Sequence, residues 1–261
     1  MKANYKNWVP GSMVIGLFAL AAVTAVLFVL AGLCLDGKLR IILMMKSGII
    51  TLILLDVAIW MFMLYRAFDY NGKRQLAKEI IEKTAEYVKL PEKGKGLDVG
   101  CGSGALTIAC AKNNLQGTMY GCDIWSGSYK GVFSKKLCED NAKAEGVDNV
   151  CFVEGNAVKL PFEDESFDAV TSNYVYHNIA GKNKQELLLE TFRVLKKGGT
   201  FAIHDLMSKY RYGDMNEFVK KLKEEGYEEV ELIDTTDGSF MSHKESVFLG
   251  LNGSTLLCGR K

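Results

Sequence analysis

Three glycines stand at every second position, Gly100, Gly102 and Gly104, directly after a short apolar run and directly before a helical pattern. This spacing predicts a strand, a tight turn and a helix, because glycine adopts positive φ and lets the backbone approach a ligand closely. The N–H groups that open the following helix favour an electron-rich or anionic group. The turn formed by Gly100, Cys101, Gly102 and Gly104 is therefore a candidate cofactor-binding loop.

Asp98, two residues before the first glycine, favours a ligand with a positively charged end. A carboxylate at this place would repel a pyrophosphate and attract an ammonium or a sulfonium. The loop also meets the loose dinucleotide pattern G-x-G-x-x-G/A, so a nicotinamide-dependent oxidoreductase stays an alternative. A purely structural turn is the weaker interpretation, because it leaves three spaced glycines and the acid unexplained.

Asp123 ends the next predicted strand, which runs from 118 to 123. A carboxylate at that strand end can accept hydrogen bonds from both ribose hydroxyls of a nucleoside. This feature is shared by several nucleoside-binding folds, so it supports a nucleoside ligand without choosing among them.

The D-x-G-x-G-x-G loop resembles the cofactor loop of class I S-adenosylmethionine (SAM) methyltransferases, including ubiquinone and menaquinone methyltransferases. Two further segments resemble signatures of that family, EGNAVKLPFEDESFDAV at 154–170 and RVLKKGG at 193–199. The likeness covers residues 73–261. It implies an α/β, Rossmann-like fold with a mostly parallel seven-stranded sheet and helices on both faces. It also implies SAM as methyl donor and S-adenosylhomocysteine as product.

The resemblance assigns further residues to the cofactor. Ile124 is expected to pack on adenine, and Ala157 to supply a backbone contact. Asn156 stands where the family normally has an acid that accepts the adenine amino group; its amide oxygen can still accept, with weaker charge assistance. Asn173 ends the fourth strand, whose end faces sulfonium and substrate in the family. An aromatic, glycine-rich insertion at 125–135 departs from the family pattern, and its Trp125 and Tyr129 could form a lid or a surface loop.

His177, His204 and Tyr174 are the candidate catalytic residues, because all three follow predicted strands at the edge where the cofactor residues gather. A histidine there can act as a general base if the methyl acceptor carries a proton, or can have a structural role. No metal site is expected: the seven cysteines show no metal-ligand spacing and are typical of buried, reduced thiols.

Residues 1–65 are expected to form a membrane hairpin, and residues 66–261 the methyltransferase domain. The stretch 9–35 has no charge, and 41–65 has only Lys46 and Asp56, so each can supply a spanning helix of ~20 residues. Basic residues at both ends favour a cytoplasmic catalytic domain. Asp56 could hydrogen-bond Thr24, Thr51 or an oligomer partner, or have a functional role.

The distribution of charged residues and the predicted membrane anchor restrict the kinds of ligand that the protein is expected to bind. The hairpin carries the excess of basic residues, and the remainder is slightly acidic, which argues against nucleic acid. A site held at the bilayer favours a small lipophilic acceptor such as a quinone, lipid, thiol or phenol. The alternative is a SAM-binding membrane module without turnover. The oligomeric state and the atom that is methylated stay open.

Overall fold

The computed structural model describes residues 2–125 and 131–261, and these divide into two compact units. The smaller unit comprises residues 6–78. The larger unit comprises residues 79–261 together with the N-terminal residues 1–5. The N-terminal segment therefore belongs to the larger unit, whereas the sequence predicts it as part of the hairpin.

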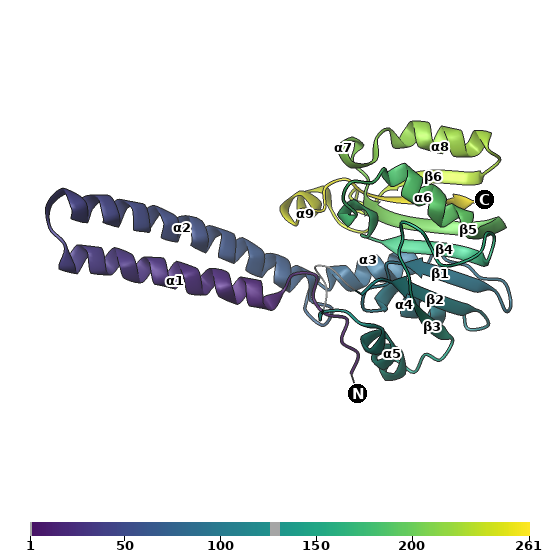
Figure 1. The fold of residues 1–261 in the computed structure, drawn as a ribbon, viewed down its shortest axis with the longest axis horizontal. Coiled ribbons are helices and arrows are strands. Elements are labelled where there is room, and N and C mark those ends of the chain that lie inside the picture. The colour runs from purple at the N-terminus through teal and green to yellow at the C-terminus, as the bar shows by residue number, and fades with distance from the viewer. Residues whose placement is uncertain (1, 126–130) are drawn as a thin grey trace. The chain divides into compact units, whose positions relative to one another are not determined.

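Two long helices, α1 (Gly11–Cys34) and α2 (Gly37–Phe68), form an antiparallel pair in the smaller unit (Figure 1). Small residues allow the close approach: a Cβ added at Gly48 would lie 3.3 Å from the Phe28 ring, and one added at Gly32 would lie 3.4 Å from Met44. Both helices are long and apolar enough to cross a membrane. The second helix begins four residues before its predicted start, because only Leu35 and Asp36 separate the two helices.

The hairpin has one polar contact at mid-height. The hydroxyl groups of Thr24 and Thr51 lie 2.8 Å apart, and each also contacts a backbone carbonyl of its own helix. Asp56 is exposed on the hairpin surface. The two threonines thus pair with each other, and the predicted bond from either of them to Asp56 is not formed.

The larger unit contains a seven-stranded sheet of order β3-β2-β1-β4-β5-β7-β6. The first five strands of this order pair in parallel, and β7 pairs antiparallel with both β5 and β6. The predicted α/β fold is confirmed. The apolar-patterned segments 227–234 and 254–259, which the sequence allows to pair as a closing antiparallel hairpin, form β6 and β7. The strands are β1 (Lys95–Val99), β2 (Thr118–Asp123), β3 (Val150–Glu154), β4 (Phe167–Asn173), β5 (Leu195–Leu206), β6 (Glu228–Asp234) and β7 (Ser254–Arg260).

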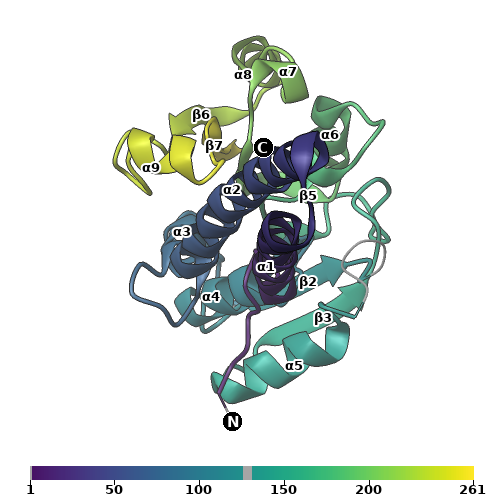
Figure 2. The ribbon, with the colours of Figure 1, turned by 90° about the vertical axis from the view of Figure 1, so that its left-hand side faces the viewer.

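Helices flank this sheet, with β3 and α5 at one end and β6 with α8 at the other (Figures 1 and 2). Among the described residues the remaining helices are α3 (Leu76–Ala85), α4 (Ala105–Asn113), α5 (Lys135–Ala144), the 3₁₀ turn η2 (Tyr176–Asn178), α6 (Lys184–Arg193), α7 (Lys209–Tyr212), α8 (Met215–Glu224) and α9 (His243–Phe248). The sequence does not predict α7 or α9, which are each only four to six residues long.

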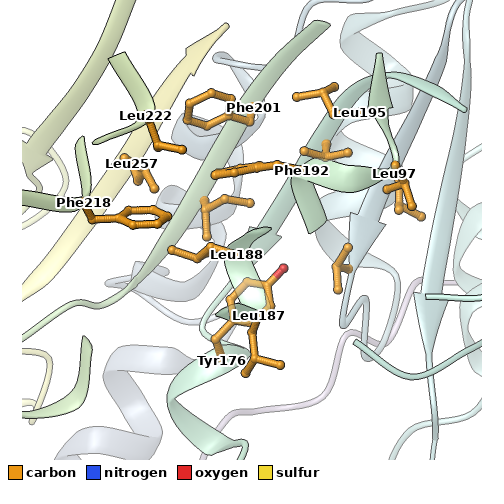
Figure 3. Close-up of a cluster of buried hydrophobic side chains, with 14 of the residues drawn as sticks. Leu97, Tyr176, Leu187, Leu188, Phe192, Leu195, Phe201, Phe218, Leu222 and Leu257 are labelled. Atoms are coloured by element: carbon orange, nitrogen blue, oxygen red, sulfur yellow. The ribbon is translucent and has the colours of Figure 1, made fainter. Parts of the chain in front are cut away.

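Strands β4 and β5 are buried along most of their length, as expected for strands covered on both faces, and their buried positions near the carboxyl ends include polar residues such as Thr171 and His204. Phe192, Phe201 and Tyr176 fill the space beside them, together with leucines from several elements (Figure 3). Burying each such side chain contributes about 1.5–3 kcal/mol. This core fixes β4 and β5, whose carboxyl ends carry the candidate catalytic residues.

Candidate functional site

The carboxyl ends of the parallel strands meet at one edge of the sheet. Strand register brings Val99 opposite Cys122, Asp123 opposite Glu154, and Asn173 opposite His204. The predicted site residues from β1, β2, β4 and β5 therefore stand on neighbouring strand ends. Ligands of open α/β sheets bind at this kind of edge.

The loop after β1 bends as its glycines predict. Gly100, Gly102 and Gly104 have φ of 75°, 55° and 81°, all in the region that disfavours side chains with Cβ. The N–H groups of Gly100 and Cys101 both donate to the Cys122 carbonyl, which ties the loop to β2. Gly104 is the N-cap of α4 and has no side chain to cap it, so the first N–H groups of that helix are open to a ligand.

Asp123 holds the loop from the neighbouring strand. Its Oδ2 accepts from Gly102 N at 2.9 Å, and its Oδ1 accepts from Trp125 N at 2.8 Å. An ionised carboxylate has about four acceptor positions, so two remain for ribose hydroxyls. The Trp125 indole donates to the Gly102 carbonyl at 3.0 Å. Ile124 is 44% exposed beside them and is accessible to an adenine ring. Tyr129, the other predicted lid residue, lies outside the described residues.

Asp98 lies in the interior, with only 1% of its surface exposed. Thr107 Oγ1 donates to its Oδ2 at 2.6 Å. Burial raises the pKa of Asp98 to about 7, although the bond from Thr107 opposes that shift. A cation placed near this carboxyl would favour its ionised form, which is the electrostatic role that the sequence predicts.

Asn156 is exposed after β3, and its Oδ1 accepts from Val158 N at 2.9 Å. The second lone pair of this oxygen and the amide NH₂ remain for a nucleobase. Ala157 follows and is partly buried. Both residues are therefore accessible where the resemblance places the adenine.

His204 and Tyr174 are tied into the protein interior. His204 is fully buried; its Nδ1 lies 2.8 Å from Asn173 Oδ1 and its Nε2 lies 2.9 Å from Thr235 Oγ1. Burial lowers the pKa of His204 to about 3, so the ring is neutral at physiological pH. Tyr174 has φ of 54°, and its hydroxyl contacts Ser254 Oγ at 2.6 Å. Burial raises the pKa of Tyr174. These contacts favour structural roles for the side chains of His204 and Tyr174.

His177 is arranged differently, because its ring is held by a carboxylate on one side only. His177 Nδ1 lies 2.5 Å from Asp205 Oδ1, and 15% of the histidine side chain is exposed. Asp205 is fully buried and also accepts from the hydroxyl of Tyr212 at 2.8 Å. Burial acts to raise the pKa of Asp205, but the bonds from His177 and Tyr212 outweigh it and lower that pKa.

The ionised Asp205 carboxylate can only accept, so His177 Nδ1 donates to it, and in the neutral form of the ring Nε2 is the nitrogen with the lone pair. A neutral imidazole oriented in this way can act as a general base. Sequence reasoning identified His177 and missed Asp205 and Tyr212. The dipeptide His204–Asp205 at the end of β5 is the local signal, but adjacent residues of a strand point to opposite faces. His204, which precedes Asp205 directly in the sequence, is the histidine that is buried.

The segment that carries His177 also lies against the glycine-rich loop. A Cβ added to Gly100 would lie 2.4 Å from Val175 Cγ2, so the absence of a side chain at Gly100 gives Val175 its place. Only Tyr176 separates Val175 from His177. The described residues contain no group of three or more metal-ligating side chains.

The family model described as a methyltransferase domain matches residues 97–203. The demethylmenaquinone methyltransferase of Geobacillus stearothermophilus is 39% identical over 110 residues, which are 41% of this chain and 44% of that protein. The demethylmenaquinone methyltransferase of Bacillus subtilis is 34% identical over 129 residues, 48% of this chain and 51% of that protein. The chain thus spans about half the length of the curated relatives it matches.

Two solved structures have similar folds. The [4+2]-cyclase SpnF has a TM-score of 0.55 at 19% identity, covering 74% of this chain and 85% of that one. Geranyl diphosphate methyltransferase in complex with GPP and sinefungin has a TM-score of 0.55 at 15% identity, covering 75% and 81%. One of the two is named as a cyclase, so the likeness in fold does not by itself define the chemistry.

Proposed function

We propose a function from one premise: the chain carries a class I methyltransferase domain, and its family match and fold imply S-adenosylmethionine as methyl donor. On this premise the protein transfers a methyl group from SAM to a small lipophilic acceptor at a membrane surface. His177 takes the acceptor's proton, and Asp205 orients His177.

The residues at the strand ends fit the cofactor. A loop of three glycines with positive φ leaves its backbone uncovered by side chains, which suits close approach by the methionine part. Asp123 has acceptor positions for the ribose, and the exposed Ile124 supplies an apolar surface for the adenine. Asp98, Gly100, Cys101, Gly102, Gly104, Asn156, Ala157 and Asn173 complete the proposed cofactor set.

The observation that carries the proposed role of His177 is its bond to Asp205, two residues beyond the contact between Val175 and Gly100. When bound, SAM supplies a sulfonium-activated methyl group. The bond between that carbon and the acceptor atom forms as the carbon–sulfur bond breaks, with its electron pair going to sulfur. The acceptor proton goes to His177 Nε2, and Asp205 stabilises the resulting imidazolium. Orientation of the two reactants can lower such a barrier by roughly 7–11 kcal/mol.

Two features support a lipophilic acceptor. The helices α1 and α2 can anchor the domain at a bilayer, where apolar substrates concentrate. The matching relatives from Geobacillus stearothermophilus and Bacillus subtilis are named as demethylmenaquinone methyltransferases, which supports a quinone-like ring as the acceptor. A phenolic or enolic ring carries a proton that must leave, and this requirement matches a histidine base.

The decisive experiment incubates the full-length protein in lipid nanodiscs with SAM carrying a deuterated methyl group and a membrane lipid extract. Mass spectrometry should find an apolar product that contains the labelled methyl group, with stoichiometric S-adenosylhomocysteine. Absence of product from quinone, phenol and lipid fractions, with SAM binding intact, would favour the second candidate function.

That second candidate is a SAM-binding module without turnover. Asn156 favours it, because this amide replaces an acid and its oxygen already accepts from Val158. A module of this kind would bind SAM in calorimetry, release no S-adenosylhomocysteine, and be indifferent to substitution of His177.

A further inference from the structure

Asn141, on the inner face of α5, binds the backbone of a residue 137 positions away. Asn4 N donates to Asn141 Oδ1 at 2.7 Å, and Asn141 Nδ2 donates to the Asn4 carbonyl at 3.2 Å. The side-chain amide of Asn141 thus bonds both backbone polar groups of Asn4, its N–H and its carbonyl. The Asn4 atoms in these two bonds are backbone atoms, so these two bonds do not require a particular side chain at position 4.

The same side chain reaches the candidate cofactor loop. Asn141 Nδ2 also donates to the Ser103 carbonyl at 2.9 Å, between Gly102 and Gly104. One helical turn earlier, Cys138 Sγ lies 3.2 Å from the Gly102 carbonyl. The inner face of α5 therefore holds two successive carbonyls of the loop and fixes the orientation of its peptide planes.

The connection is buried at its inner end. Asn141 is 2% exposed and Ser103 is 7% exposed, whereas Asn4 is exposed and its two bonds to Asn141 are partly buried. The Asn141 side-chain amide makes three hydrogen bonds, all to backbone groups. Loss of the N-terminal segment would leave its Oδ1 without a donor and one N–H of its Nδ2 without an acceptor. A buried polar group without a partner is costly, so the amide would shift and release the Ser103 carbonyl.

We propose that residues Asn4 and Tyr5 are a positioning element of the cofactor site, with Asn141 coupling their docking to the conformation of the glycine-rich loop. The proposal rests on the proposed function and extends it. Linkage is reciprocal: a docked segment favours the binding-competent loop, and a bound cofactor favours docking of the segment. Five residues, 6–10, connect this segment to the first residue of α1. The chain that enters the predicted membrane anchor is thus connected to the methyl-donor site.

Two substitutions at one position test this coupling. Asn4→Pro removes the N–H that donates to Asn141, whereas the matched control Asn4→Ala keeps every backbone group. Affinity for S-adenosylhomocysteine is measured by calorimetry on the full-length proteins in nanodiscs, with Asn4→Ala as the reference, because both variants lack the Asn4 side chain. With Asn4→Pro the dissociation constant should rise roughly three- to tenfold, the value of one lost hydrogen bond.

A double-mutant cycle assigns the effect to Asn141. In an Asn141→Ala background the further change Asn4→Pro should leave the dissociation constant unaltered, because the connection is already broken. Hydrogen exchange measured by mass spectrometry should rise at 99–106 in Asn4→Pro and stay unchanged in β6, which a general loss of stability would not produce. Equal affinities of Asn4→Pro and Asn4→Ala, or independent effects of the two sites, would overturn the proposal. A wild-type protein that binds no S-adenosylhomocysteine would instead overturn the proposed function.

Discussion

His177 Nδ1 and Asp205 Oδ1 lie 2.5 Å apart across the ends of β4 and β5, and the carboxylate is fully buried. Asp205 also accepts from the backbone N–H of His177 at 3.2 Å, so one side chain fixes both the ring and the backbone of the histidine. The arrangement leaves Nε2 as the nitrogen that can take a proton.

Removing the base should lower the rate and leave cofactor binding intact. His177→Gln should decrease kcat by about 10²–10⁴, the usual contribution of general base catalysis. Affinity for S-adenosylhomocysteine should change less than twofold. The measurement is methyl transfer to the identified acceptor at saturating SAM. A rate within threefold of wild type would show that the acceptor loses no proton to His177.

Asp205→Asn should impair the same step through the histidine. The amide cannot hold His177 as the carboxylate does, nor stabilise its protonated form, so we expect a decrease in kcat with an unchanged KM for SAM. The conservative Asp205→Glu variant should recover part of the rate only if it restores the bond to His177. Equal rates in all three proteins would exclude a positioning role for Asp205.

Asp98 should make SAM affinity depend on pH. Its pKa of about 7 means that the unliganded site is protonated below neutrality, and binding of a cation must then release that proton. The dissociation constant should rise as pH falls from 7.5 to 5.5, at most tenfold for each pH unit. Calorimetry in buffers of different ionisation enthalpy would detect the released proton. Asp98→Asn should bind more weakly and lose this pH dependence; a persistent dependence would assign it to another group.

His204 should make the fold sensitive to acid. Its folded pKa of about 3 lies below the unfolded value, so the unfolded chain binds a proton first as pH falls below about 6.5. The stabilisation is complete above that pH and is lost on the way to pH 3. Between pH 6.5 and 5 the loss is on the order of 2 kcal/mol. Urea unfolding at pH 7.5 and 5.0 should show this loss in wild type and a smaller one in His204→Gln. The contribution of Asp98 is common to both proteins and cancels in the comparison.

Gly100→Ala should destabilise the protein because its Cβ would lie 2.4 Å from Val175 Cγ2, at a φ of 75°. Strain and overpacking together should cost about 3 kcal/mol. Gly146→Ala is the matched control: its φ is 67°, with nothing within 4 Å, so it carries strain alone, about 1 kcal/mol. Similar melting temperatures for the two variants would mean that Val175 moves aside without cost.

Much of this fold could be predicted from local pattern. The glycine spacing defined the loop, and the apolar runs defined the five parallel strands. The pairing of β6 with β7 was allowed by their apolar patterns, although α9 between them was not predicted. A six-residue helix gives too few turns for a periodic signal.

The site was less predictable because its decisive contacts join distant residues. Asp205 lies 28 positions from His177, and Asn141 lies 137 positions from Asn4. Residue spacing in the sequence predicts contacts within one helix or strand, or between elements joined by a short loop. Neither of these two pairs is of that kind, so neither can be recognised from a local pattern. The sequence alone also did not distinguish His177 from His204 as a candidate base. The burial of His204 in the structure is what separates the two.

The strand order has a consequence for biosynthesis. Strand β6 borders only β7, and β7 lies between β6 and β5. During translation β6 leaves the ribosome before the strand that connects it to the sheet, so it has no edge to join until β7 follows. The apolar helices α1 and α2 are made long before that moment. The sheet would therefore be completed on a nascent chain whose N-terminal helices are already available to the membrane insertion machinery.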